Sequence, residues 1–221
     1  KEWRTGKSVL LDEDNISRYC NLKSGYEKRP TTPISPIFND LEIYRTLQEA
    51  DIVAAEDTRR TGVLLKHYHI ETSMVSYHAY NEERRTEDIV SRVKQGERVA
   101  VLSDAGMPVI SDPGFLLVRR AHEEDIALHI IPGVSAVTHA VAVSGLPPDR
   151  FVYGGYPPVK KGKRQNFLKD LESAEGTVFL FESPYRITRL LEDVSYVYGP
   201  ETFVVLAREA TKRHGECLRG K

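Results

Sequence analysis

The sequence contains little cysteine and no long apolar run. Only Cys20 and Cys217 occur among its 221 residues, and they stand far apart. Two isolated cysteines give neither a disulfide framework nor a zinc-binding pattern, which is typical of proteins in a reducing compartment. No apolar stretch approaches the roughly 20 residues that span a bilayer, and residues 1–5 do not begin a signal peptide. We therefore expect a cytoplasmic protein without a membrane partner.

Several ligand-binding motifs are also missing. No Gly-x-Gly-x-x-Gly follows an apolar run and there is no Walker loop, so the sequence supports neither an ordinary dinucleotide site nor a P-loop. His and Cys do not cluster as zinc ligands, and we expect no metal. The formal net charge is −1, so any contact with nucleic acid must come from a local basic patch.

Short apolar runs alternate with longer amphipathic runs along the chain. The apolar runs are continuous and rich in branched residues, which is typical of parallel strands covered on both faces. This alternation predicts the α/β class. The predicted strands are residues 52–55, 99–102, 128–131, 177–181 and 202–206, with 8–11 as a further candidate. The predicted helices are residues 41–49, 82–95, 115–124, 135–144, 164–173 and 187–197.

A proline-rich segment divides the chain. Residues 145–149, Gly-Leu-Pro-Pro-Asp, break regular structure and stiffen the connection. We therefore predict an N-terminal α/β domain of residues 31–148 and a C-terminal α/β domain of residues 149–221. Residues 1–30 are polar and rich in turn formers over most of their length, and the pattern assigns them to neither domain.

The loops that follow the predicted strands are unusually polar. Residues 103–114 carry two Ser-Asp pairs, two glycines and two prolines, so they could hold a ligand at the carboxyl edge of a parallel sheet. The alternative is a plain turn in which Ser111 or, more readily, Asp112 caps the next helix. Residues 132–136 could likewise offer a helix N-terminus to an anion, or form a simple turn capped by Ser135.

Three other segments carry charged or aromatic side chains. Residues 56–60 combine acids with Arg59 and Arg60, which could grip a phosphate or form a solvated helix start. Residues 76–82 place aromatics near His78, where the rings could stack on bases and the imidazole could move a proton. Residues 160–164 form a basic run that could contact a phosphate backbone. A structural role for His78 and a solvated face for the basic run are the plainer interpretations.

In this order, the motifs resemble those of the ribosomal RNA small-subunit methyltransferase I family, in the tetrapyrrole-methylase superfamily. The resemblance covers roughly residues 41–214. The matching motifs are Ala55-Glu56-Asp57-Thr58-Arg59, Ser76-Tyr77-His78 with Asn81-Glu82, Ser103-Asp104-Ala105-Gly106 with Pro108, Ile110-Ser111-Asp112-Pro113-Gly114, Pro132-Gly133 with Ser135-Ala136, Ser144-Gly145-Leu146-Pro147, Lys160-Lys161-Gly162-Lys163-Arg164, Phe181-Glu182-Ser183-Pro184 with Arg186, and Ala207-Arg208-Glu209 with Thr211-Lys212.

The resemblance implies a fold, a donor and a substrate. It implies a tetrapyrrole-methylase-like protein of two α/β domains, with S-adenosylmethionine in the cleft between them, and a homodimer. The expected reaction is 2′-O-methylation of a cytidine ribose in 16S rRNA, either naked or in the small ribosomal subunit. The implied donor-site residues are Ser103, Asp104, Ala105, Gly106, Ser135, Ala136, Phe181, Ala207 and Arg208. The candidate RNA contacts are Arg59, Arg60, Lys160, Lys161, Lys163 and Arg164.

Methyl transfer to a ribose hydroxyl would be helped by a proton acceptor. His78, Glu56 and Glu82 are the candidates, and the sequence does not choose among them. Two alternative functions stay open. One is a small-molecule tetrapyrrole methylase, as elsewhere in the superfamily. The other is an inactive member that binds donor or RNA, suggested by Ser35, which stands where the family has glycine.

Overall fold

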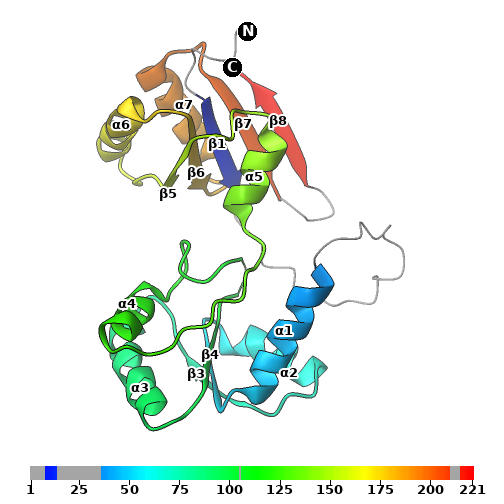
Figure 1. Ribbon diagram of the computed structural model, residues 1–221. Coiled ribbons are helices and arrows are strands. Elements are labelled where there is room, and N and C mark those ends of the chain that lie inside the picture. The colour runs from blue at the N-terminus through cyan, green and yellow to red at the C-terminus, as the bar shows by residue number, and fades with distance from the viewer. Residues whose placement is uncertain (1–7, 14–35, 105, 210–214) are drawn as a thin grey trace. The chain divides into compact units, whose positions relative to one another are not determined.

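Two units make up the part of the chain that the computed structural model describes, residues 8–13, 36–104, 106–209 and 215–221 (Figure 1). The three-strand unit lies within Ser17–Val134, and the five-strand unit combines Ser135–Lys221 with the first strand of the chain. Ser35 lies outside the described residues. No helix in the described ranges combines the length and the apolar character that crossing a membrane requires.

The three-strand unit is a parallel sheet with helices on both faces. Its strands run in the order β3-β2-β4. Alternate residues of β2 point to opposite faces, so Val53 packs toward α1 and α2 while Ala54 packs toward α3 and α4. The strands are β2 (Ile52–Ala55), β3 (Ser73–Ser76) and β4 (Val99–Leu102). The helices are α1 (Pro36–Glu49), α2 (Thr58–His67), α3 (Glu82–Lys94) and α4 (Phe115–Glu123).

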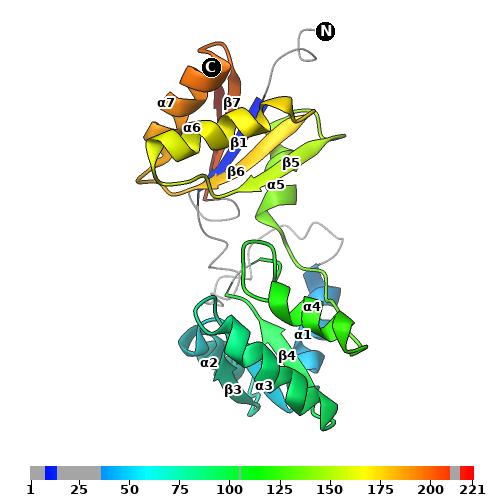
Figure 2. The same cartoon turned by 90° about the vertical axis from the view of Figure 1, so that its left-hand side faces the viewer.

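The five-strand unit is a mixed sheet with the order β5-β6-β1-β7-β8, in which only β8 runs antiparallel to its neighbour. Helix α5 covers one face, and α6 and α7 cover the other (Figure 2). The strands are β1 (Ser8–Glu13), β5 (Phe151–Gly155), β6 (Thr177–Glu182), β7 (Phe203–Arg208) and β8 (Glu216–Gly220). The helices are α5 (Ala136–Ser144), α6 (Lys161–Asp170), the short 3-10 helix η3 (Leu171–Ser173) and α7 (Ile187–Tyr198).

The α/β class predicted from the sequence is confirmed, and one predicted strand is wrong. Residues 128–131 form no strand, and Leu128 and Ile130 are exposed. An apolar run becomes a strand only when another strand pairs with it, and these residues pair with none of the described strands. The pattern also did not predict α2, β3, β5 and β8.

The change of unit falls earlier in the chain than the predicted boundary at residue 148. Val137, Ala140 and Val141 of α5 pack against Phe179 and Val205 of the five-strand sheet. This contact places α5 with the five-strand unit rather than with the residues before it. The first strand β1 joins the same unit, because it lies between β6 and β7 in the sheet.

Candidate functional site

The carboxyl ends of β3, β2 and β4 lie side by side. The parallel register pairs Ala55 with Ser76 on one side and with Leu102 on the other. Backbone pairing continues past the strands, because Ala55 O accepts a hydrogen bond from Tyr77 N–H at 2.7 Å and Leu102 O accepts one from Glu56 N–H at 3.1 Å. The loops that follow the three strands therefore start at the same edge of the sheet.

Asp104 is the centre of a network at this edge. Its Oδ1 accepts the backbone N–H of Asp57 at 3.2 Å, and its Oδ2 accepts Nη1 of Arg60 at 3.0 Å. In return, the backbone N–H of Asp104 donates to Oε2 of Glu56 at 3.1 Å. The structure thus brings together three predicted site residues with different expected roles, Glu56, Arg60 and Asp104. These contacts also fix the start of the 103–114 loop against the end of β2.

Asp57 holds the start of α2. Its Oδ1 accepts the backbone N–H of Arg59 at 2.9 Å, as an N-cap, and its Oδ2 accepts Nη2 of Arg59 at 2.9 Å. The hydrogen bond from the Arg59 side chain is the main reason that the pKa of Asp57 is lowered to about 2. Arg59 remains 90% exposed at its side chain, so its guanidinium can still reach an external anion.

Asp112, from the second Ser-Asp pair of the loop, carries a raised pKa. Burial raises the pKa of its carboxyl to about 7, and the nearby charges of Glu56 and Asp104 add to the effect, against a hydrogen bond with Ser103. Three carboxyl groups, those of Glu56, Asp104 and Asp112, therefore lie close to one another at this edge of the sheet. Asp112 is not among the predicted site residues, although the repeated Ser-Asp pair is a signal that could have identified it.

Helix α4 does not start at the predicted cap. Its N-cap is Gly114, at φ 132°, so the prediction of Ser111 or Asp112 as the N-cap residue is wrong. Oε1 of Glu82 takes this role, since it accepts the backbone N–H groups of Gly114 at 2.8 Å and of Leu116 at 3.2 Å. A carboxylate at this position also favours the positive end of the helix dipole.

Tyr77 completes the contact around Glu82. Its hydroxyl donates to Oε1 of Glu82 at 3.2 Å and lies 3.3 Å from Oγ1 of Thr86. The ring is only 1% exposed, and burial is the main cause that raises the pKa of Tyr77 to about 12. Glu82, a candidate base, therefore already accepts three hydrogen bonds through one oxygen.

His78, a second candidate base, lies in a turn that Asn81 holds in place. Oδ1 of Asn81 accepts the backbone N–H of His78 at 2.8 Å, and Nδ2 of Asn81 donates to the carbonyl of Ser76 at 3.2 Å. These two bonds fix which way the amide faces. Nδ2 of Asn81 also lies 3.3 Å from Nε2 of His78. Nδ1 of His78 is buried without a hydrogen-bond partner among the described residues.

The basic run at residues 160–164 divides into exposed and buried members. Lys160, Lys161 and Lys163 are exposed, at the N-terminus of α6. Arg164 is only 4% exposed, and its Nε donates to Oδ2 of Asp193 at 2.7 Å. The predicted RNA contact at Arg164 is therefore wrong, because its guanidinium is committed to a buried ion pair inside the five-strand unit.

Besides Asp104, the predicted donor-site residues Ser103 and Gly106 lie in the 103–114 loop, with Gly106 at φ 76°, and Ala105 lies outside the described residues. The remaining predicted donor-site residues lie in the five-strand unit. Ser135 is the N-cap of α5 without a side-chain cap bond, and Ala136 is buried. Phe181 packs edge-on against Tyr153, with ring centroids 5.4 Å apart. Ala207 belongs to the core, and Arg208 pairs with Glu216 at 2.8 Å.

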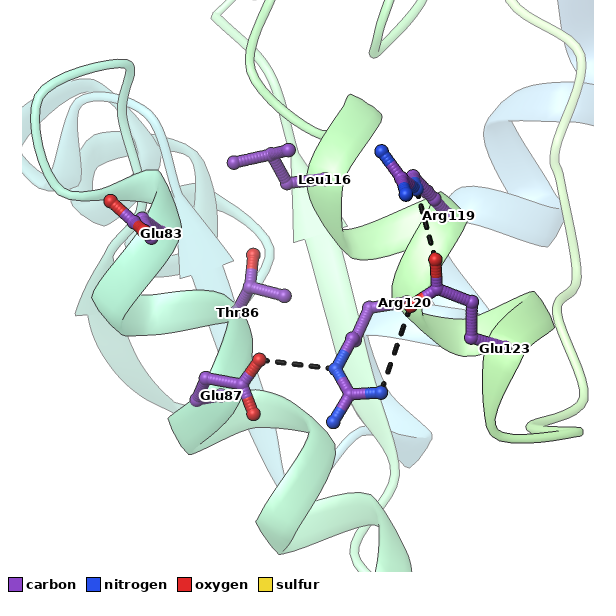
Figure 3. Close-up of a pocket in the computed structure, with 7 residues that line it drawn as sticks. All are labelled: Glu83, Thr86, Glu87, Leu116, Arg119, Arg120 and Glu123. Atoms are coloured by element: carbon purple, nitrogen blue, oxygen red, sulfur yellow. Dashed lines mark hydrogen bonds and ion pairs between the residues drawn. The ribbon is translucent and has the colours of Figure 1, made fainter.

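A pocket of about 190 Å³ lies elsewhere, between α3 and α4 of the three-strand unit (Figure 3). It contains none of the predicted site residues. Arg120 pairs with Glu87 at 3.1 Å and Arg119 pairs with Glu123 at 2.9 Å, so its charges largely neutralise one another. The lining residues are Glu83, Thr86, Glu87, Leu116, Arg119, Arg120 and Glu123. Within the ranges that the structure describes, no group of His, Cys, Asp or Glu is arranged to hold a metal ion.

Comparison with known proteins identifies relatives for most of the chain. The model of the tetrapyrrole (corrin/porphyrin) methylases matches residues 41–221. A protein of Thermotoga maritima named "Ribosomal RNA small subunit methyltransferase I" is 44% identical over 192 residues, which are 86% of this chain and 85% of that protein. Proteins of the same name from Synechocystis sp. and Escherichia coli O157:H7 are 43% and 42% identical over 79% and 75% of this chain. The chain spans 63% and 58% of the length of these two relatives.

Solved structures show the same fold at low sequence identity. A cobalt precorrin-4 methyltransferase matches 97% of this chain with a TM-score of 0.57 and 17% identity, and the match covers 85% of that protein. Uroporphyrin-III C-methyl transferase from Thermus thermophilus, complexed with S-adenyl homocysteine, matches 98% with a TM-score of 0.51 and 17% identity, over 88% of that protein. The chain therefore belongs to the tetrapyrrole (corrin/porphyrin) methylase family, within the group of proteins named ribosomal RNA small subunit methyltransferase I.

Proposed function

We propose that the protein transfers a methyl group from S-adenosylmethionine to the 2′-hydroxyl of a cytidine in 16S rRNA. The observation that carries the proposal is identity of 42–44% to proteins named as rRNA methyltransferases, over 75–86% of the chain. The partner is then the rRNA or the small ribosomal subunit. The proposal includes the homodimer that the family resemblance implies and the cytoplasmic location expected from the sequence.

The charge at the end of the three-strand sheet fits this donor. S-adenosylmethionine carries a sulfonium and an ammonium group, and Glu56, Asp104 and Asp112 lie together at the carboxyl ends of β2 and β4. The charges of Glu56 and Asp104 add to the effect of burial in raising the pKa of Asp112, and a cationic ligand would relieve this repulsion. We propose that Asp104 and its loop hold the donor on the three-strand unit. For the five-strand unit, the family resemblance alone leads us to propose Ser135, Ala136, Phe181, Ala207 and Arg208 as donor contacts.

Of the three candidate bases, we propose Glu56 as the proton acceptor. Nε2 of His78 already lies against the amide of Asn81, and Glu82 caps α4. Glu56 lies beside the proposed donor loop, and its Oε2 receives a single backbone hydrogen bond from Asp104 among the described residues. The donor supplies an activated methyl group when bound. The protein then aligns the ribose oxygen, receives its proton and excludes water.

Labelled methyl transfer tests the proposal. The protein is incubated with methyl-labelled S-adenosylmethionine and either small ribosomal subunits, extracted 16S rRNA or uroporphyrinogen. Label in the rRNA of either ribosomal sample supports the proposal. Label in the tetrapyrrole alone, or donor binding without any transfer to rRNA, would contradict it.

The donor site has its own test by calorimetry. Asp104→Ala removes the carboxylate that anchors the loop, and we expect donor affinity to fall at least about tenfold, as for a lost charged hydrogen bond. Asp88→Ala is the matched control, since Asp88 pairs with Arg85 and Arg92 on α3. Equal donor affinity of Asp104→Ala and the control would remove Asp104 from the donor site.

A further inference from the structure

Two tyrosines stand out because the fold leaves them almost fully exposed. Tyr80 is 99% exposed and Tyr185 is 92% exposed, the two highest values among the exposed large apolar side chains of the described residues. Each follows the carboxyl end of a parallel strand, β3 for Tyr80 and β6 for Tyr185. Neither ring contributes to a hydrophobic core, so packing within the fold does not explain why a tyrosine stands at either position.

The turn that carries Tyr80 is held rigidly. Asn81, which follows Tyr80, forms hydrogen bonds with the backbone of His78 and Ser76, which precede it. The ring of His78 lies edge-on to that of Tyr80, with centroids 6.1 Å apart. In the same turn Tyr77 is buried as an anchor. A ring on a fixed backbone loses little conformational entropy when a ligand stacks on it.

The turn that carries Tyr185 is built in the same manner. Oγ of Ser183 accepts the backbone N–H of Tyr185 at 3.3 Å, and the carbonyl of Ser183 accepts that of Arg186 at 2.9 Å. Oε1 of the buried Glu182 accepts the backbone N–H of Ser183 at 2.7 Å and also pairs with Arg186. Side-chain hydrogen bonds thus fix both turns, although they belong to different units.

An arginine follows each tyrosine at the same spacing. Arg84 and Arg189 stand four residues after Tyr80 and Tyr185, and each is the third residue of the helix that follows, α3 or α7. Both arginines are exposed. Neither forms an ion pair within the described part of the chain. An exposed ring with a nearby unpaired guanidinium combines a stacking surface for a base with a contact for its phosphate.

We propose that Tyr80 and Tyr185 stack on unpaired bases of the RNA substrate, while Arg84 and Arg189 contact the adjacent phosphates. The inference rests on the proposed function, since it names how the RNA acceptor is held. Single-stranded RNA is the partner that fits, because unpaired bases expose their ring faces and a duplex does not.

RNA binding by single variants tests the inference. The probe is a fluorescent 16S rRNA fragment, measured by anisotropy with the full chain. Tyr80→Ala and Tyr185→Ala should each weaken binding about 5- to 150-fold, the range for losing one base stack. Tyr80→Phe and Tyr185→Phe should bind normally, and the leucine variants should bind as weakly as the alanine variants, because only the aromatic face matters.

The controls separate stacking from charge and from folding. Tyr196→Ala removes a tyrosine that is 72% exposed on α7 but does not follow a strand end, and it should bind RNA normally. Arg84→Ala and Arg189→Ala should each lower the slope of log affinity against log salt by about 0.7, whereas the tyrosine variants should keep it. Thermal unfolding and donor affinity should be unchanged in all tyrosine variants.

Three other results would overturn the inference, and they differ in what they mean for the proposed function. If both alanine variants bind the fragment as tightly as the wild type, the inference is overturned while the proposed function stands. If they lose methylation of assembled subunits but bind naked RNA normally, the tyrosines contact a protein and the inference is again overturned. If the wild type neither binds nor methylates rRNA, the proposed function fails and takes the inference with it.

Discussion

Oε1 of Glu82 lies 2.8 Å from the backbone nitrogen of Gly114, and this contact joins two segments that the sequence separates by a helix and a strand. The first residue of α3 thereby caps α4. The same oxygen binds the hydroxyl of the buried Tyr77. The end of the 103–114 loop is therefore held by a carboxylate outside the loop, just as its start is held by the contacts of Asp104.

Replacing Glu82 should destabilise the three-strand unit. Glu82→Ala leaves two backbone N–H groups and one tyrosine hydroxyl without their acceptor, and we expect the free energy of unfolding to fall by about 1–3 kcal/mol. Glu82→Gln keeps an acceptor oxygen and should recover most of this loss. Urea unfolding measures both, with Glu83→Ala, the exposed neighbour, as the control. If the Glu82→Ala and Glu83→Ala variants have the same free energy of unfolding, the cap on α4 contributes nothing to stability.

Asp112 should make stability depend on pH. Its pKa is about 7 in the folded protein and 3.8 as the reference value, so between these values the folded state binds a proton that the unfolded state has lost. Stability therefore falls as pH rises from about 4 to about 7 and is then constant for this group. Asp112→Asn stays neutral, so its advantage over the wild type should grow from pH 5 to pH 8.

Urea unfolding of both proteins at several pH values measures this difference, because other titrating groups cancel in the comparison. Asp125→Asn serves as a control in the same unit, since Asp125 is exposed. A stability difference between Asp112→Asn and the wild type that stays constant from pH 5 to pH 8 would show that Asp112 is ionised throughout.

The pair of Arg164 and Asp193 should matter for folding and not for RNA. Removing one partner leaves a buried charge unpaired, so Arg164→Ala should lower the free energy of unfolding by about 3–5 kcal/mol. Replacement of both partners by apolar residues, as in Arg164→Met with Asp193→Leu, should recover much of it. Lys163→Ala removes an exposed charge one residue away and should change stability by less than about 0.5 kcal/mol. If Arg164→Ala unfolds at the same urea concentration as Lys163→Ala, the ion pair is not structural.

Much of the architecture could be predicted from the chain. Runs such as residues 99–102 and 178–181 are continuous and apolar, so they identify strands of the sheets without further information. The run at residues 128–131 looks the same in sequence, but a strand needs a partner, and the pattern contains no information on pairing. The sequence pattern missed strand β8 for the converse reason, because all five of its residues are exposed and no apolar run marks them.

The candidate site was predictable as a set of loops, and less so residue by residue. The parallel register makes strand ends meet, so grouping Glu56 with Asp104 followed from the fold class. The roles of Glu82 and Arg164 did not, since each depends on a contact about 30 residues away in the chain. Local sequence spacing predicts that the nearest polar residue caps a helix and that a charged residue in a basic run is exposed. Tertiary packing instead gives the cap of α4 to Glu82 and buries Arg164.

The position of the transferred methyl group tests the central claim most directly. Labelled rRNA from the transfer reaction is hydrolysed with alkali, which cleaves after every nucleotide whose 2′-hydroxyl is free. We predict that the label is recovered in an alkali-resistant dinucleotide that contains 2′-O-methylcytidine. Label recovered in mononucleotides would place the methyl group on a base and contradict the account.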